Sequence, residues 1–291
     1  MLRAMIVVVT LDPAVHVSYE TKRIVPGQSH PVGRVTYRAG GRGPAVARML
    51  HTFGHEVVAA GLTGGTAGEL IKAELSRVGV PTQFTPIVME SRRVVEVTDV
   101  STGTTTSFAE PSPYITTEEL GRLAADYRAL IEGASGAVLC GGVPDALPPE
   151  TFATFATYAA EAGVPVVLDA GGSALWHGAA RRPALAIPED GDAGALLESG
   201  AGAVAILSDA GVKAFTSAGQ WSAALLGARP APAARDALVA GFVPGITLKW
   251  SWPDTLAHAV ALAESCDASG VVDLEAYERL LPQVTVSQHA T

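Results

Sequence analysis

Residues 230–245, Pro-Ala-Pro-Ala-Ala-Arg-Asp-Ala-Leu-Val-Ala-Gly-Phe-Val-Pro-Gly, take the chain from a proline-punctuated loop into an alanine-rich helix. The one acid in this stretch, Asp236, is predicted to lie in the first turn of the helix, where the helix dipole stabilises negative charge. Two interpretations are open. The acid is either an ordinary feature of a helix start, or a base that takes a proton from a substrate hydroxyl while neighbouring backbone N–H groups hold an anion.

The composition indicates a globular protein that acts on small molecules. The 291 residues are 48% hydrophobic and 17% charged, which is enough apolar material for one large α/β domain or two smaller ones. Asp and Glu outnumber Lys and Arg by 29 to 20, and the resulting net charge of −9 supplies no sequence-wide basic field for nucleic acid or an anionic membrane. We therefore expect a small-molecule partner, no nucleic acid and no membrane.

Cysteine and histidine usage indicates a reducing compartment and no histidine-based metal site. Cys140 and Cys266 form neither a disulfide framework nor a metal-ligand spacing, so we expect a cytoplasmic protein in which Cys140 packs as a small apolar side chain. The seven histidines are scattered. The apolar start, residues 5–11, is too short for a membrane span and lacks a signal-peptide cleavage site, so it is predicted to be a buried first strand.

Short β-branched runs alternate with alanine-rich stretches along most of the chain, which is typical of a mainly parallel sheet flanked by helices. We predict helices over about 42–53, 66–78, 117–132 and 149–162, and strands over 57–61, 137–140, 164–169, 184–187 and 203–207. Asp169 is expected to end its strand rather than to do chemistry. Two patches of alternating, polar strands, at about 20–38 and 84–110, are expected to pair as a small β-sheet lid on a single α/β domain, with lid boundaries of about 12–38 and 84–112.

Several short segments match, in order, the motifs of one known family. They are Thr10-Leu-Asp12-Pro-Ala-Val-His16, Ala39-Gly40-Gly41-Arg42-Gly43-Pro-Ala45-Val-Ala-Arg48, Gly61-Leu-Thr-Gly-Gly65-Thr-Ala-Gly68, Ser91-Arg92, Gly103-Thr-Thr-Thr-Ser-Phe-Ala-Glu110-Pro111, Gly141-Gly-Val-Pro144, Val167-Leu-Asp169-Ala-Gly-Gly172, Ala234-Arg235-Asp236-Ala237 and Val272-Asp-Leu-Glu-Ala-Tyr277. No single motif is specific for this family, but the agreement of all of them in the same order along the chain is specific. The chain resembles the PfkB carbohydrate kinases of ribokinase-like fold, and within them the branch of 1-phosphofructokinase and tagatose-6-phosphate kinase.

The resemblance implies ATP-dependent phosphoryl transfer, with Mg²⁺, to a hydroxyl of a phosphorylated ketose such as fructose 1-phosphate or tagatose 6-phosphate. It makes Asp236 the catalytic base, beside an anion hole at Ala233, Ala234 and Arg235. It also assigns three further sets of positions: substrate binding to Asp12, His16, Gly40, Gly41, Arg42, Arg92 and Glu110, nucleotide binding to Glu189, Ser208 and Gly211, and metal binding to Asp192.

This sequence departs from the family pattern at many of these positions. The two glycines of the family's Gly-Ala-Gly-Asp are Ala233 and Arg235 here, and glycine lets bare backbone approach a phosphate. A long side chain at 235 either changes the shape of the anion hole or supplies a new phosphate clamp. The family's Lys-Pro-Asn-x-x-Glu reads Ile187-Pro-Glu189-Asp-Gly-Asp192, and an asparagine of its glycine-rich motif is Ala45.

Two functional hypotheses follow. The first is an ATP-dependent kinase with Asp236 as base and with Arg42 and Arg92 holding the acceptor. The second is a catalytically silent relative that binds a sugar phosphate or nucleotide as a sensor or partner subunit. The retained Asp236 favours the first hypothesis, whereas Arg235 and the stretch 187–192 favour the second. The alternating lid strands also predict a homodimer that pairs through the lid.

Overall fold

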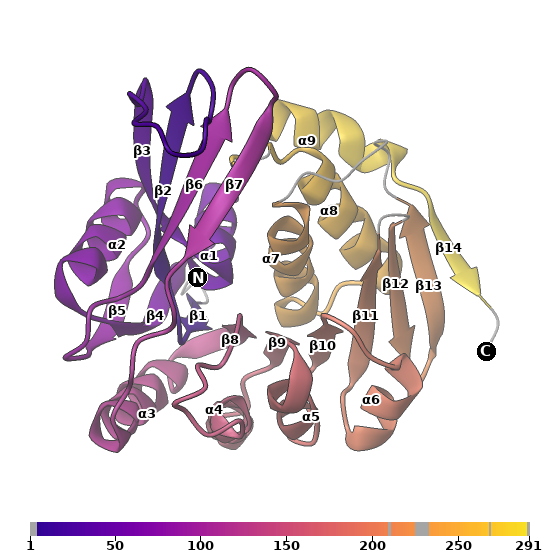
Figure 1. The fold of residues 1–291 in the computed structure, drawn as a ribbon. Helices are drawn as coiled ribbons and strands as arrows, with labels where there is room; N and C mark the ends of the chain where they lie inside the picture. The colour runs from indigo at the N-terminus through magenta and orange to yellow at the C-terminus, as the bar shows by residue number, and fades with distance from the viewer. Residues whose placement is uncertain (1–4, 209–210, 225–232, 268, 290–291) are drawn as a thin grey trace.

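The computed structural model describes residues 5–208, 211–224, 233–267 and 269–289. Within these residues one large sheet has the strand order β14-β13-β12-β11-β10-β9-β8-β1-β4-β5 (Figure 1). Its strands are β1 (Met5–Thr10), β4 (Val57–Thr63), β5 (Thr82–Pro86), β8 (Ala134–Cys140), β9 (Val166–Ala170), β10 (Leu185–Pro188), β11 (Ala203–Ser208), β12 (Gly211–Thr216), β13 (Gly219–Ala224) and β14 (Val286–His289).

The sheet is parallel from β5 to β11 and antiparallel from β11 to β14. The central strands are buried on both faces, as their unbroken apolar runs require. The predicted architecture, a mainly parallel sheet flanked by helices with a separate small sheet, is therefore confirmed.

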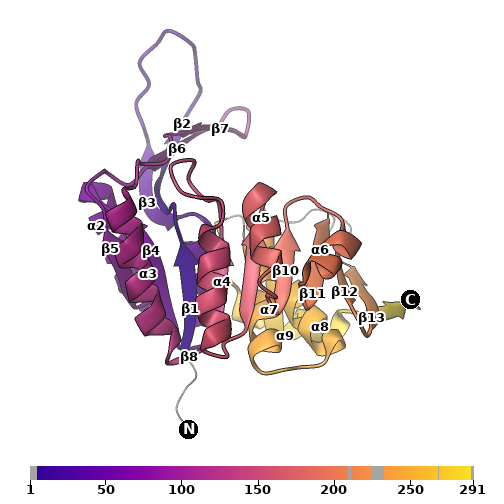
Figure 2. The same cartoon turned by 90° about the horizontal axis from the view of Figure 1, so that it is seen from below.

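Helices cover both faces of the large sheet (Figures 1 and 2). On one face lie α1 (Arg42–Thr52), α2 (Gly65–Arg77), α7 (Ala234–Thr247), α8 (Trp252–Glu264) and α9 (Leu274–Leu280), which is followed by a short 3₁₀ helix (Leu281–Gln283). On the other lie α3 (Thr117–Ile131), α4 (Thr151–Glu161), α5 (Gly172–Ala179) and α6 (Ala193–Ser199). Each layer encloses its own buried apolar cluster. Among the described helices, none combines the length and the apolar character needed to cross a bilayer.

A separate small sheet has the order β3-β2-β6-β7 and is built from β2 (Ala14–Thr21), β3 (Arg34–Gly40), β6 (Arg93–Asp99) and β7 (Thr104–Ala109). It joins the two polar patches of the sequence, because β2 pairs in parallel with β6. The predicted boundary at residue 84 was too early. Residues 82–86 form β5, which pairs with β4 in the large sheet, so the second patch joins the small sheet only from Arg93 onward.

Helix α7 lies close against α8, and two glycines permit the approach. A Cβ atom added to Gly241 would lie 2.4 Å from the Cα of Ala259, and one added to Gly245 would lie 2.3 Å from the Oγ1 of Thr255. The glycines sit one helical turn apart and so present one smooth strip to α8. This packing fixes α7 on the sheet and carries its first turn to the carboxyl ends of β9 and β10.

Candidate active site

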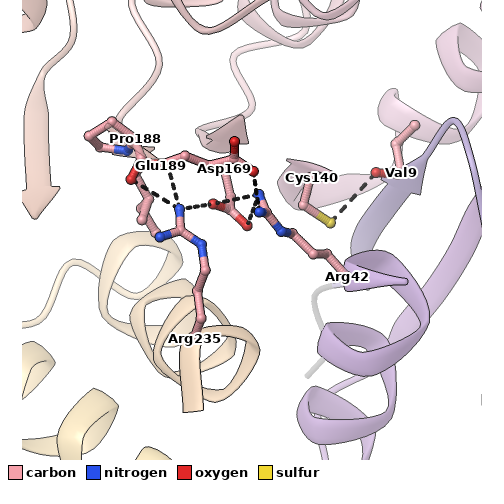
Figure 3. A network of polar contacts seen from close by, with 8 residues as sticks. Val9, Arg42, Cys140, Asp169, Pro188, Glu189 and Arg235 are labelled. Carbon is pink, nitrogen blue, oxygen red and sulfur yellow. Dashed lines mark hydrogen bonds and ion pairs between the residues drawn. The ribbon is translucent and has the colours of Figure 1, made fainter. Parts of the chain in front are cut away.

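The candidate site lies where the carboxyl ends of the central parallel strands meet the first turns of α1 and α7. In an open α/β sheet this is the edge at which ligands bind. Asp169 near the end of β9, Arg42 at the start of α1 and Arg235 in the first turn of α7 converge there (Figure 3). The fold thus brings three residues together that are far apart in the sequence.

Asp169 is the centre of this cluster. Its side chain is fully buried, and its Oδ1 accepts a hydrogen bond from Nη2 of Arg235 at 2.6 Å. Nη1 of Arg42 lies 3.4 Å from the same carboxylate. Asp169 lies near the end of β9, as predicted, and because a buried carboxylate needs partners it also takes two cations there.

Arg235 reaches from α7 to the ends of β9 and β10. Besides Asp169, its Nη2 donates to the backbone carbonyls of Ile187 at 3.3 Å and Pro188 at 3.0 Å. Its Nε is buried and has no hydrogen-bond partner in the described structure. The guanidinium therefore lies across the space between α7 and the sheet, while one of its N–H groups is left unsatisfied.

Glu189 is the second acid of the cluster and forms an ion pair with Nη2 of Arg42. Its side chain is half exposed, in contrast to that of Asp169. It lies over the backbone of Gly171, where an added Cβ would lie 2.4 Å from its Oε2. Glu189 and Gly171 also line a cavity of about 350 Å³ beside the ends of β8 and β9.

Asp236 lies next to this cluster, in the first turn of α7, as the sequence predicted. Burial, together with the negative charge of Asp169, raises the pKa of Asp236 to about 6, although Arg42, Arg235 and Arg48 act in the opposite direction. No side chain caps the start of α7. The turn therefore presents a carboxyl group that titrates near neutrality beside backbone N–H groups and two guanidinium groups.

Asp12 and Arg92 form a second cluster on the small-sheet side. Nε of Arg92 lies 2.7 Å from Oδ2 of Asp12, which also accepts a hydrogen bond from Ser112 Oγ at 2.8 Å. The His16 ring packs on Gly40, where a Cβ atom would lie 1.9 Å from Cδ2 of the ring. Burial lowers the pKa of His16, so this side chain is neutral at pH 7. Gly41 precedes α1 with a φ of 94°, a conformation that favours glycine.

The remaining predicted site residues lie outside these two clusters. Glu110 follows β7 and accepts a hydrogen bond from the backbone N–H of Arg93 at 2.7 Å. Ser208 donates to the carbonyl of Gly211 at 3.2 Å, where β11 pairs with β12, and residues 209–210 between them lie outside the described part of the chain. Ala233 precedes α7 and Ala234 is buried at its start. The expected loop at 230–232 also lies outside the described residues.

The residues present do not fit a resident Mg²⁺ ion. Asp192 instead caps α6, with its Oδ1 accepting from the N–H of Ala195 at 2.8 Å. Asp169 and Glu189 are already paired with guanidinium groups. Among the described residues, no group of three or more His, Cys, Asp and Glu side chains could hold a metal ion. Mg²⁺ prefers an octahedral shell of oxygens. The carboxylate oxygens of Asp169 and Glu189 could contribute to such a shell, but they already pair with Arg42 and Arg235.

Cys140 lies beside the charged cluster without joining it. It is fully buried at the end of β8, and its Sγ lies 3.7 Å from the carbonyl oxygen of Val9 (Figure 3). Burial and the charge of Asp169 raise the pKa of its thiol. Cys140 and Cys266 are both free and buried, so the prediction of a packing role for Cys140 is confirmed.

The two guanidinium groups and the backbone N–H groups at the start of α7 are donors of the kind that suit anionic ligands. The family model of pfkB family carbohydrate kinases matches residues 4–225, and the chain belongs to this family.

Solved structures show the same fold at low sequence identity. Phosphofructokinase-2 from Escherichia coli, in complex with fructose-6-phosphate, is 19% identical with a TM-score of 0.87, over 96% of this chain and 99% of that one. A protein described as a possible 1-phosphofructokinase from Thermotoga maritima is 20% identical with a TM-score of 0.85, over 98% and 100%. A carbohydrate kinase from Agrobacterium tumefaciens is 16% identical with a TM-score of 0.76, over 98% and 100%.

Proposed function

We propose that this protein is a carbohydrate kinase that transfers the terminal phosphoryl group of ATP to a hydroxyl group of a phosphorylated ketose. The observation that carries the proposal is Asp236, a partly buried acid in the first turn of α7 whose pKa is raised to about 6. Such a carboxylate is ionised at neutral pH, yet basic enough to accept a proton. Fructose 1-phosphate and tagatose 6-phosphate are the acceptors that the family branch suggests.

In the proposed reaction, the Asp236 carboxylate takes the proton of the acceptor hydroxyl while the hydroxyl oxygen attacks the γ-phosphorus. The bond between this phosphorus and the β–γ bridging oxygen breaks, and ADP leaves with the electron pair. Asp236 then returns its proton to water. Arg42, Arg235 and the N–H groups at the start of α7 stabilise the charge that develops on the transferred group.

The small sheet is proposed to act as a lid over the acceptor. Arg92, which sits immediately before β6, and Asp12, just before β2, lie at the base of this sheet, together with His16 on β2. Arg92 would bind the phosphate of the acceptor, and Asp12 and His16 would contact its hydroxyl groups. We also propose that two copies pair through this sheet, and that the enzyme works in the cytoplasm, where its two free thiols stay reduced.

The test is phosphoryl transfer from radiolabelled ATP to each candidate ketose phosphate, with and without Mg²⁺. Asp236→Asn keeps the size of the side chain but removes the base, and we expect it to lower kcat by about 10²–10⁴-fold while ADP still binds. Glu118→Gln, the same chemical change at an exposed position on α3, serves as the control and should leave kcat unchanged. Turnover in Asp236→Asn equal to that of the unmodified protein would remove Asp236 from the mechanism.

One observation favours a second candidate function, a silent relative that binds a phosphorylated ligand as a sensor or partner subunit. The Arg235 guanidinium spans the space between α7 and the sheet and is held by Asp169 and two carbonyl groups. If the protein is such a silent relative, ATP and a ketose phosphate raise its melting temperature, because they bind only the native state. No acceptor is phosphorylated, however. Binding of ATP and a ketose phosphate without turnover would select this candidate over the kinase.

A further inference from the structure

The acids at the carboxyl ends of β9 and β10, Asp169 and Glu189, are paired with arginines, and Asp192, the metal position that the resemblance implies, caps α6 instead. We propose that Arg42 and Arg235 hold the phosphate groups of the ligand directly, and that this chain binds these groups without a divalent cation. The inference rests on one part of the proposed function, namely that the ligand of this site carries phosphate groups. It concerns how the phosphates are held, whether or not a phosphoryl group is then transferred.

The pairing of the acids in the cluster favours an incoming anion over a metal cation. Asp169 contacts both Arg42 and Arg235, and Glu189 pairs with Arg42, so two acids and two arginines balance and neither acid is free for a metal ion. A Mg²⁺ ion would have to separate the fully buried Asp169 from its guanidinium partners, which would leave charges unpaired inside the protein. A phosphate group needs no such separation, because guanidinium groups match it in charge and geometry.

Glu189 marks the position that such a phosphate would take. It neutralises Arg42 in the unliganded protein, yet its side chain is half exposed and can turn into solvent at little cost. Once it moves, it uncovers both the guanidinium of Arg42 and the backbone of Gly171, which it now covers. The cavity of about 350 Å³ that Glu189 lines gives a ligand access to this position.

Arg235 retains unused donor capacity for the same ligand. Its three hydrogen bonds all come from Nη2, while its buried Nε has no partner in the described structure. A buried donor without a partner is rare in folded proteins, and a phosphate oxygen is an acceptor of the right kind. The arginine at position 235, where the family has glycine, therefore adds charge and a donor that a glycine cannot supply.

Calorimetric titration of the 291-residue protein with inorganic pyrophosphate and with ADP tests the proposal, once in EDTA and once in excess Mg²⁺. We expect the affinity without metal to equal or exceed the affinity with metal. Arg235→Gly should weaken metal-free binding by about tenfold or more, because a charge-assisted contact is lost. Glu189→Gln should strengthen metal-free binding several-fold, because the competing anion is gone.

The control is Arg181→Gly, which removes an equal charge at an exposed position after α5 and should leave metal-free binding unchanged. Circular dichroism melts establish that each variant folds. Binding that requires Mg²⁺, or an Arg235→Gly variant that binds as tightly as the unmodified protein, would overturn the proposal. Metal-free binding without turnover would sustain this inference and reject the kinase, whereas turnover together with ligand binding that requires Mg²⁺ would do the reverse.

Discussion

Asp236 ionises less readily than an exposed aspartate, because burial and the charge of Asp169 raise its pKa from 3.8 to about 6. Below about pH 3 the carboxyl group is neutral in both the folded and the unfolded chain. Between about pH 4 and 6 the unfolded chain ionises the group while the folded protein keeps it protonated, so the free energy of unfolding falls progressively, and the full loss is present above pH 6. We predict that Asp236→Asn and the unmodified protein have the same free energy of unfolding near pH 3, and that the variant is about 2–3 kcal/mol more stable at pH 8. Urea titrations at several pH values measure this difference. Equal stabilities of the variant and the unmodified protein at pH 8 would show that folding does not raise the pKa of Asp236.

Asp236 and Asp169, the two main acids of the site, differ in how far their positions could be predicted from the sequence. Asp236 was predictable, because an acid in the first turn of a helix entered from a proline-rich loop is a local pattern. The role of Asp169 was not, because an aspartate at the end of a strand is common. Only the fold places it between Arg42, 127 positions away, and Arg235, 66 positions away.

At the scale of elements, the packing of α7 on α8 determines where the first turn of α7 lies. We predict that Gly241→Ala destabilises the protein by roughly 1–3 kcal/mol, because the added Cβ would meet the backbone of Ala259 at 2.4 Å. The control is Gly121→Ala in α3, where nothing lies within 4 Å of the added Cβ. This variant should gain about 0.5–1 kcal/mol, since alanine is the better helix former. Urea unfolding measures both, and a neutral Gly241→Ala would show that the two helices can move apart freely.

Long helices with clear periodicity were predicted, and several other helices were missed. The helices over 117–131 and 151–161 agree with the expected ranges of about 117–132 and 149–162 to within two residues. The short helices α5 and α6, of eight and seven residues, were not predicted, because so few residues give no clear hydrophobic periodicity. Helix α8 was also missed, although its start carries a local signal: Ser251 caps it, Pro253 lies in its first turn and Asp254 follows. Strand β5 was assigned to the wrong sheet, because strand pairing is a property of the fold.

At the scale of the whole molecule, the small sheet has one apolar face that a second copy of the chain could cover. Val17 pairs with Tyr37 on β3 and with Val95 on β6, and Val95 pairs with Phe108 on β7, so these four side chains share a face. Val35 lies on the same face of β3, two residues before Tyr37. Tyr37, Phe108 and Val35 are 59%, 61% and 45% exposed. The base of this face packs on α2, where Val15, Tyr37 and Leu70 line a common cavity, and the rest projects beyond it.

We predict that the protein sediments as a homodimer, at twice the chain mass of 29.8 kDa, because burying this face removes large apolar side chains from water. Tyr37→Lys places a charge in the centre of the face and should weaken the dimer by about tenfold or more, as loss of a central aromatic anchor does. Thr36→Lys adds the same charge to the opposite face of the same strand, so it should leave the dimer intact. Sedimentation velocity across a concentration series distinguishes the variants. A monomer at every concentration, or equal dissociation constants for the two lysine variants, would exclude this face as the interface.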